Sequence, residues 1–129
     1  MFDRSRGVFK SLNAHEVKYL VIGGIAAIIH GSPRSTTDVD IVIEPSLENA
    51  QRLLDALEDA GFGTASLTSA PEIVANEITV FKDRIRLDVQ TATPGLKFDE
   101  AWARRVAVNN AAGEFFVVSR EDLIASKLA

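Results

Sequence analysis

The sequence predicts a mixed β-sheet with helices packed on it, in the α/β or α+β class. Two observations support this: short runs of strand-forming residues alternate with segments of helical periodicity, and turn residues separate them. A length of 129 residues suits one such unit with a buried core. We therefore interpret residues 1–129 as a single minimal domain, which could be truncated at its C-terminal end.

The first half of the chain is expected to alternate between helix and strand. Its clearest element is a helix with leucine and alanine on one face, opened by Ser46 as N-cap and closed by Gly61. The expected elements, in order, are a helix, a strand, a short apolar helix, a strand and this long helix, over residues 5–16, 19–22, 25–30, 37–44 and 47–60.

The second half is expected to contain two hairpins and two helices. Residues 62–76 show no clear period and receive no assignment. Ser119, with Asp122 three residues later, is typical of a capping box that opens a last helix. The expected strands cover residues 77–81, 85–91, 106–108 and 115–118, with a short helix over 98–105 between the hairpins.

Composition excludes several classes of protein. A net charge of −4 and a pI near 5.1 argue against broad, nonspecific binding to nucleic acid, although Lys82, Arg84 and Arg86 could form a local basic patch. No apolar run approaches the roughly 20 residues of a membrane span, and no signal-peptide pattern opens the chain. The absence of cysteine excludes disulfides and thiolate metal sites. We expect a cytoplasmic protein without a membrane partner.

Asp38 and Asp40 stand two residues apart at the start of an apolar run. Residues two apart on a strand face the same side, so both carboxylates would project together. Two neighbouring ionised carboxylates repel one another, and burial raises the cost; a divalent cation between them removes both penalties. The pattern predicts a Mg²⁺ site, although two solvated acids at a strand end would show the same spacing.

Asp88 is a third candidate acid, in the middle of the strand expected over 85–91. If that strand neighbours 37–44, Asp88 lies beside the other two acids. It could then act as general base for an attacking hydroxyl, or as a ligand to a second ion. The alternative is a surface carboxylate paired with Arg86, which alternation places on the same face.

Two further features could bind a phosphate. Gly23 and Gly24 form a strand-to-helix turn in which backbone amides could approach an anion. Arg34, in the polar loop that follows, could reach a triphosphate through its guanidinium. A tight turn and a solvated arginine are the structural alternatives, because the glycine pair is neither a Walker A loop nor a dinucleotide-binding turn.

Together these motifs resemble the nucleotidyltransferase superfamily that includes DNA polymerase beta. Its pattern is an apolar residue, a glycine pair, a spacer, then Asp-apolar-Asp and a later third acid. The string that continues through His30, Gly31 and Arg34 is similar to the toxin-type nucleotidyltransferases of bacterial abortive-infection systems. The matching residues are Ile22-Gly23-Gly24, Asp38-Val39-Asp40-Ile41 and Asp88.

The resemblance implies a nucleotidyltransferase fold, a mixed sheet of about four to five strands flanked by helices. It implies Mg²⁺ or Mn²⁺ as cofactor. Lys127 matches a lysine in a C-terminal helix that contributes to the site of the toxin-type relatives. The implied metal ligands and catalytic residues are Asp38, Asp40 and Asp88, and the implied nucleotide-binding residues are Gly23, Gly24, Arg34 and Lys127.

Three hypotheses of function follow. The first is an enzyme that moves a nucleoside monophosphate from an NTP such as ATP to a hydroxyl of an RNA (tRNA, for example), a protein or a small molecule. The second is a non-catalytic nucleotide-binding relative, acting as a sensor or as a toxin–antitoxin component, as a homodimer or with an antitoxin partner. A D-x-D glycosyltransferase is a weaker third alternative, because such enzymes normally need a longer chain.

Overall fold

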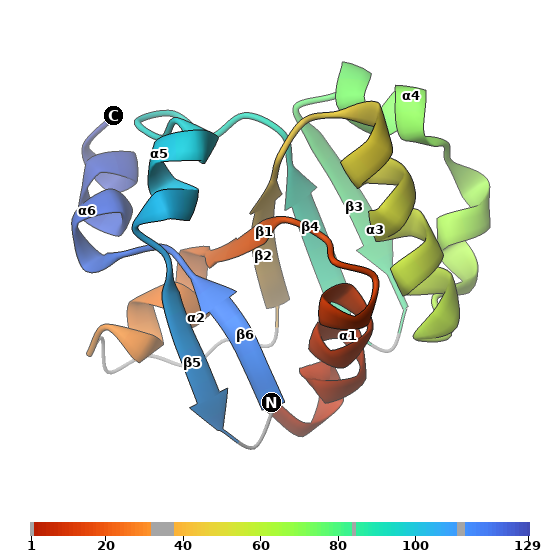
Figure 1. Ribbon diagram of the computed structural model, residues 1–129, viewed down its shortest axis with the longest axis horizontal. Coiled ribbons are helices and arrows are strands. Elements are labelled where there is room, and N and C mark those ends of the chain that lie inside the picture. Colours follow the sequence, from red (N-terminus) through yellow and green to blue (C-terminus); the bar gives the residue numbers. More distant parts are fainter. Residues whose placement is uncertain (1, 32–37, 84, 111–112) are drawn as a thin grey trace.

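Six strands form one mixed sheet in the computed structural model, which describes residues 2–31, 38–83, 85–110 and 113–129, with residues 2–6 as backbone only (Figure 1). The strands are β1 (Tyr19–Ile22), β2 (Asp38–Ile43), β3 (Ile78–Lys82), β4 (Arg86–Gln90), β5 (Val106–Asn110) and β6 (Gly113–Val117). Their order is β3-β4-β2-β1-β6-β5, with β2/β4 and β1/β6 parallel. The mixed sheet is as predicted, with six strands instead of four to five.

The helices lie close to their expected positions. The segment 62–76, which showed no period, continues from α3 as a short 3-10 helix followed by α4. One boundary matters for the site, because α2 begins at Gly23 itself and not at residue 25. The helices are α1 (Phe2–Ala14), α2 (Gly23–Ile29), α3 (Leu47–Asp59), the 3-10 helix η1 (Gly63–Leu67), α4 (Ala70–Ala75), α5 (Phe98–Ala103) and α6 (Arg120–Leu128).

The main core lies on the face of the sheet covered by α1 and α3 (Figure 1). The ring of Phe9 in α1 stacks on those of Phe115 and Tyr19, with centroids 4.5 and 6.2 Å apart. Alternation along the strands sends the other side chains to the opposite face, which α2 covers over β1 and β2. The buried strand residues on the α1 face are Tyr19, Val21, Val39, Ile41, Ile43, Phe81, Leu87, Val89, Phe115 and Val117.

Helix α3 is fixed at both ends as the sequence indicated. The Ser46 hydroxyl accepts a hydrogen bond from the Asn49 amide at 3.1 Å, and Gly61 takes the left-handed conformation with φ +88°. The buried Asn49 side chain also donates to the carbonyls of Lys18 and Glu44, both at 3.0 Å. This side chain ties α3 to the start of β1 and the end of β2.

Helix α6 begins with the capping box that Ser119 and Asp122 indicated. The Asp122 amide donates to the Ser119 hydroxyl at 3.1 Å. Arg104, after α5, adds two hydrogen bonds to the same carboxylate, at 2.8 and 3.1 Å, which the sequence did not reveal. These bonds hold the pKa of Asp122 below its usual range and join the end of α5 to the start of α6.

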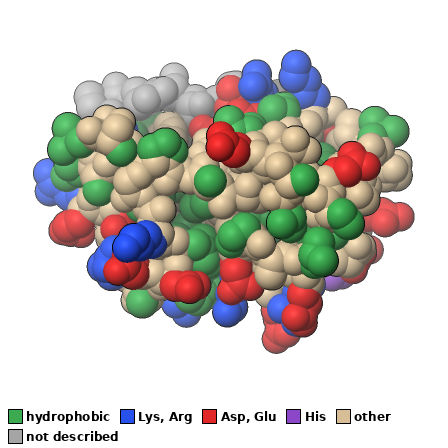
Figure 2. Space-filling model, turned by 90° about the horizontal axis from the view of Figure 1, so that it is seen from above, with side chains coloured by type: hydrophobic (Ala, Val, Ile, Leu, Met, Phe, Trp, Pro, Cys, Tyr) green, Lys and Arg blue, Asp and Glu red, His purple; other side chains and the backbone are tan. Residues whose placement is uncertain are grey.

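The surface carries no broad field of one charge on the face drawn in Figure 2, where acidic and basic side chains are interspersed among hydrophobic ones. This agrees with the modest net charge of −4. Across the part of the chain that the structure describes, no helix has both the length and the apolar character that crossing a bilayer requires.

Candidate active site

The parallel pairing of β2 with β4 brings Asp40 and Asp88 together. Asp40 lies directly opposite Asp88 in the register, and Asp38 lies opposite Arg86. Neighbouring strands are about 4.8 Å apart, so opposed side chains on one face are within contact reach. The predictions that these strands are neighbours and that the acids share one face are confirmed.

The two carboxylates interact strongly. The pKa of Asp40 rises from 3.8 to about 6, first because the group is half-buried and then because of the charge of Asp88 and a hydrogen bond with it. The charge of Asp38 acts in the same direction with a smaller effect, and Arg86 opposes the rise. Asp40 and Asp88 thus form a site that favours a bound proton or another cation.

Arg86 is the immediate partner of Asp88. Its Nε donates to Oδ1 of Asp88 at 2.9 Å, and the Asp88 side chain is 19% exposed against 45% for Arg86. Asp88 therefore pairs with Arg86, as one interpretation predicted, and it also faces Asp40, whereas its role as general base or metal ligand stays a prediction. Through this bond Arg86 supplies positive charge to the acid pair from its exposed side.

Replacing Arg86 with glutamine is expected to raise the pKa of Asp40 above its value of about 6, because the opposing positive charge is lost. A carboxyl-carbon NMR titration of the metal-free protein measures this directly. Arg86→Lys keeps the charge and should move the pKa less. An unchanged Asp40 titration in Arg86→Gln would show that Arg86 does not act on the pair.

Gly23 lies against Asp40 from the β1 side. Its φ of +65° is in the left-handed region, and a Cβ at this position would overlap Oδ2 of Asp40. Gly24 is different, because it is buried within α2, which packs against β1 and β2. The first glycine is therefore required by the carboxylate, and the second is buried in the packing of α2.

The remaining predicted site residues are Asp38, Lys127 and Arg34. Asp38 is partly buried at the start of β2 and acts on Asp40 through its charge. Lys127 is exposed in the last turn of α6. Arg34 lies outside the described residues. The roles of these three residues stay predictions.

Mg²⁺ or Mn²⁺ fits the acid pair by the chemistry of its donors. Within the described ranges, no three or more histidine or acidic side chains lie close enough together to hold a metal ion. However, Mg²⁺ commonly takes only one or two carboxylates and completes its shell with water and substrate phosphates. Asp40 and Asp88 lie directly opposite each other on one face and supply two such carboxylates. The three-acid ligand set stays a prediction.

Comparison with known proteins places the chain in a family. Residues 7–129 match the family described as nucleotidyltransferase of unknown function (DUF6036). The chain belongs to this family. The crystal structure of a Thermotoga maritima protein, provisionally assigned as a nucleotidyltransferase, shows the same fold with a TM-score of 0.65. Its identity is 15%, over 95% of this chain and 80% of that chain. No curated protein matches the chain. The resemblance to nucleotidyltransferases is thereby confirmed for both sequence and fold.

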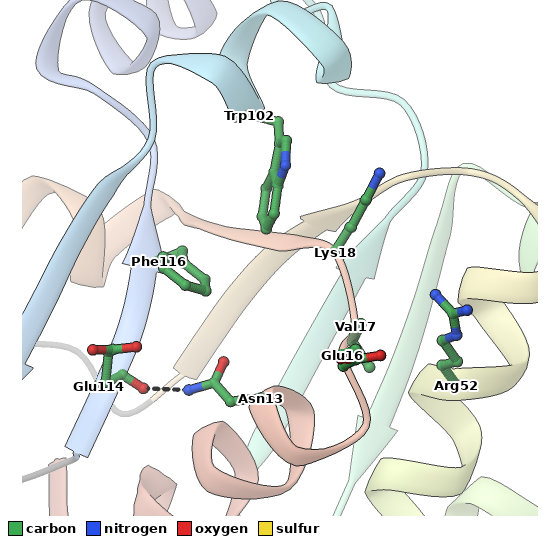
Figure 3. A pocket seen from close by; sticks show the side chains of 8 residues that line it. All are labelled: Asn13, Glu16, Val17, Lys18, Arg52, Trp102, Glu114 and Phe116. Carbon is green, nitrogen blue, oxygen red and sulfur yellow. Dashed lines mark hydrogen bonds between the residues drawn. The ribbon is translucent and has the colours of Figure 1, made fainter.

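A separate pocket of about 460 Å³ lies at the opposite end of β1 from the acid pair. Figure 3 shows Trp102 and Phe116 on one side of it and Arg52 on the other, with Lys18 between. Trp102 packs its edge on Phe116, and Arg105 covers the Trp102 ring at 4.1 Å. Sequence reasoning missed this cluster, because its members come from separate elements and follow no motif. Lys18 and Arg52 already pair with Glu44 and Glu48, so the pocket offers a ligand little unmet charge.

Proposed function

We propose that this protein transfers a nucleoside monophosphate from an NTP to a hydroxyl group in a Mg²⁺-dependent reaction that releases pyrophosphate. The observation that carries the proposal is the Asp40–Asp88 pair beside Gly23, in a chain of nucleotidyltransferase family and fold. ATP is one candidate donor. RNA, a protein or a small molecule could supply the hydroxyl.

The acid pair would hold the metal ion, with Asp38 as an additional ligand. Bound there, Mg²⁺ would neutralise charge on the transferred phosphate and would make the acceptor hydroxyl more acidic. The hydroxyl oxygen attacks the α-phosphorus and gives up its proton to a carboxylate or to water. The bond to the bridging oxygen breaks, and pyrophosphate leaves with the bonding electrons.

The turn at Gly23 would orient the phosphates. The N-cap residue of α2 is Ile22, whose side chain makes no capping hydrogen bond, and backbone amides at a helix N-terminus can receive an anion. Because Gly23 lies directly against the Asp40 carboxylate, an anion received by this backbone would lie next to the acid pair. Arg34 and Lys127 are proposed as further phosphate contacts.

A non-catalytic nucleotide-binding protein, in a sensor or toxin–antitoxin role, is the second candidate. One observation favours it: the acids do not form a three-ligand group among the described residues. Such a protein would bind Mg²⁺ and NTP at the same pair without releasing pyrophosphate.

The test is release of pyrophosphate from each of four α-labelled NTPs in Mg²⁺, with tRNA, protein or no added acceptor. We expect Asp40→Asn and Asp88→Asn to lower the rate by about 10²-fold or more, because positioned charges typically contribute this much in such sites. Asp99→Asn, at an exposed position in α5, is the matched control. NTP binding without pyrophosphate release would favour the non-catalytic alternative, and the absence of Mg²⁺-dependent NTP binding would refute both.

A further inference from the structure

Strand β3 continues the row of side chains that contains the acid pair. Val80 lies opposite Asp88 in the β3/β4 register, as Asp40 does in the β2/β4 register. Val80, Asp88 and Asp40 therefore form one row on one face. Ile78 lies two residues before Val80 and faces the same side. Both are exposed, at 55% for Ile78 and 40% for Val80, so an apolar surface adjoins the acids.

The geometry of phosphoryl transfer gives this surface a role. Gly23 adjoins Asp40 on the β1 side, whereas Val80 adjoins Asp88 on the β3 side. In a phosphoryl transfer the attacking and leaving oxygens are roughly in line, on opposite sides of the phosphorus. If the pyrophosphate lies toward Gly23, as in the proposed function, the attacking hydroxyl approaches from the β3 side, over Val80.

The positive charge of Lys82 next to this surface favours an acceptor that carries an acidic group. Lys82 follows Val80 on the same face, opposite Arg86. It is exposed, and no acidic side chain within the described part of the chain forms an ion pair with it. Two residues along a strand span about 7 Å, so an apolar group over Val80 and an acidic group at Lys82 can belong to one short peptide segment.

A protein matches these features better than a nucleic acid does. Two exposed β-branched side chains offer apolar contact and no aromatic ring for stacking a base. The net charge of −4 also opposes the approach of a long polyanion. An acidic residue near the acceptor hydroxyl, by contrast, would meet Lys82.

We propose that Ile78, Val80 and Lys82 form the acceptor-binding surface, and that the acceptor is a hydroxyl-bearing segment of a protein with neighbouring apolar and acidic side chains. The proposal rests on the proposed function. The hydroxyl oxygen forms the new bond to the α-phosphorus, its proton goes to a carboxylate or to solvent, and pyrophosphate departs. The product is a nucleotidylated side chain.

Defined peptides provide the test. The probes are acetylated hexapeptides with one tyrosine or serine between leucines and one aspartate two residues away, incubated with α-labelled NTP and Mg²⁺. The matched peptides lack the hydroxyl or carry lysine in place of aspartate, and a 12-nucleotide RNA with a free 3′-hydroxyl is a further probe. The variant Ile78→Ser/Val80→Ser is compared with Val106→Ser, because Val106 is a similarly exposed valine on the far edge strand β5.

We expect label on the hydroxyl peptides with aspartate, and an increase in peptide KM of about tenfold or more in Ile78→Ser/Val80→Ser with the KM for NTP unchanged. Val106→Ser should match the parent protein. Lys82→Glu should reverse the preference in favour of the lysine peptide. Equal loss in both serine variants, labelling of RNA alone, or NTP binding without labelling of any peptide would overturn the inference and leave Mg²⁺-dependent NTP chemistry intact. Failure to bind NTP with Mg²⁺ would instead refute the proposed function itself.

Discussion

Replacing Asp40 with asparagine should make the metal-free protein more stable and should remove its response to Mg²⁺. The folded protein holds a carboxyl whose pKa is raised from 3.8 to about 6, so ionising this group is harder in the folded than in the unfolded state. Asparagine keeps the shape and a hydrogen-bond donor toward Asp88 and carries no charge. The repulsion therefore disappears with the carboxylate.

The gain in stability depends on pH in a defined direction. Well below the ordinary pKa of 3.8 the carboxyl is protonated in both states, and the substitution should have little effect. The destabilising cost of the raised pKa grows between about pH 4 and 6 and is complete above the folded value of about 6. The shift corresponds to about 3 kcal/mol at most, and solvent around a half-exposed group reduces this to about 1–2 kcal/mol.

Mg²⁺ should also stabilise the parent protein, because a bound cation offsets the repulsion between the carboxylates. With a Kd of ~1 mM and ~10 mM metal, the free energy of unfolding rises by about 1.4 kcal/mol, or a few degrees in Tm. Thermal unfolding of the parent, Asp40→Asn and the exposed control Asp55→Asn with and without Mg²⁺, at pH 4.5 and 8, measures both effects. An Asp40→Asn variant that is less stable at pH 8, or that responds to Mg²⁺ as the parent does, would contradict the account.

Replacing Gly23 with alanine should destabilise the fold and disrupt the acid pair together. The left-handed φ of +65° costs an ordinary residue about 1–2 kcal/mol. The new Cβ would in addition overlap Oδ2 of Asp40, so the carboxylate must move or the turn must open. We expect a total loss of about 2–4 kcal/mol in the free energy of unfolding, measured by urea denaturation, together with loss of the Mg²⁺ response.

Gly61 supplies the matched control for this variant. Its φ is +88°, but a Cβ there would meet no atom within 4 Å, so Gly61→Ala shows the backbone cost alone. The excess loss in Gly23→Ala over Gly61→Ala then measures the overlap with Asp40. Adding Asp40→Ala should remove most of that excess, because the overlapping carboxylate is gone. Equal losses in both glycine variants, unchanged by Asp40→Ala, would show that Gly23 is not held against the carboxylate.

The sequence was sufficient for most of the fold because its local signals agree with one another. Alternation of apolar and polar residues identified β4, an apolar run identified β2, and caps indicated both ends of α3 at Ser46 and Gly61. The alternation of side chains between the two faces of a strand also predicted that Asp40 and Asp88 share one face of the sheet. A shift of either strand by one residue would turn its acid toward the core.

Other features depend on contacts between distant segments, which leave no local pattern. The bond from Arg104 to Asp122 joins two elements that are neighbours only after folding. The close approach of Gly23 to Asp40 likewise arises from the antiparallel register that sets Ile22 opposite Asp40. The exposed Ile78 and Val80 read as ordinary strand residues, and their position beside Asp88 becomes visible only with the β3/β4 pairing.

The central claim is that Asp40 and Asp88 hold a divalent cation beside Gly23. The most direct test is paramagnetic broadening of backbone amide NMR signals by substoichiometric Mn²⁺, in the parent and in Asp40→Asn. The account predicts that the amides of Gly23, Asp40 and Asp88 broaden first in the parent, that excess Mg²⁺ reverses this, and that Asp40→Asn abolishes it. Broadening centred on acids elsewhere in the chain, or an unchanged pattern in Asp40→Asn, would contradict it.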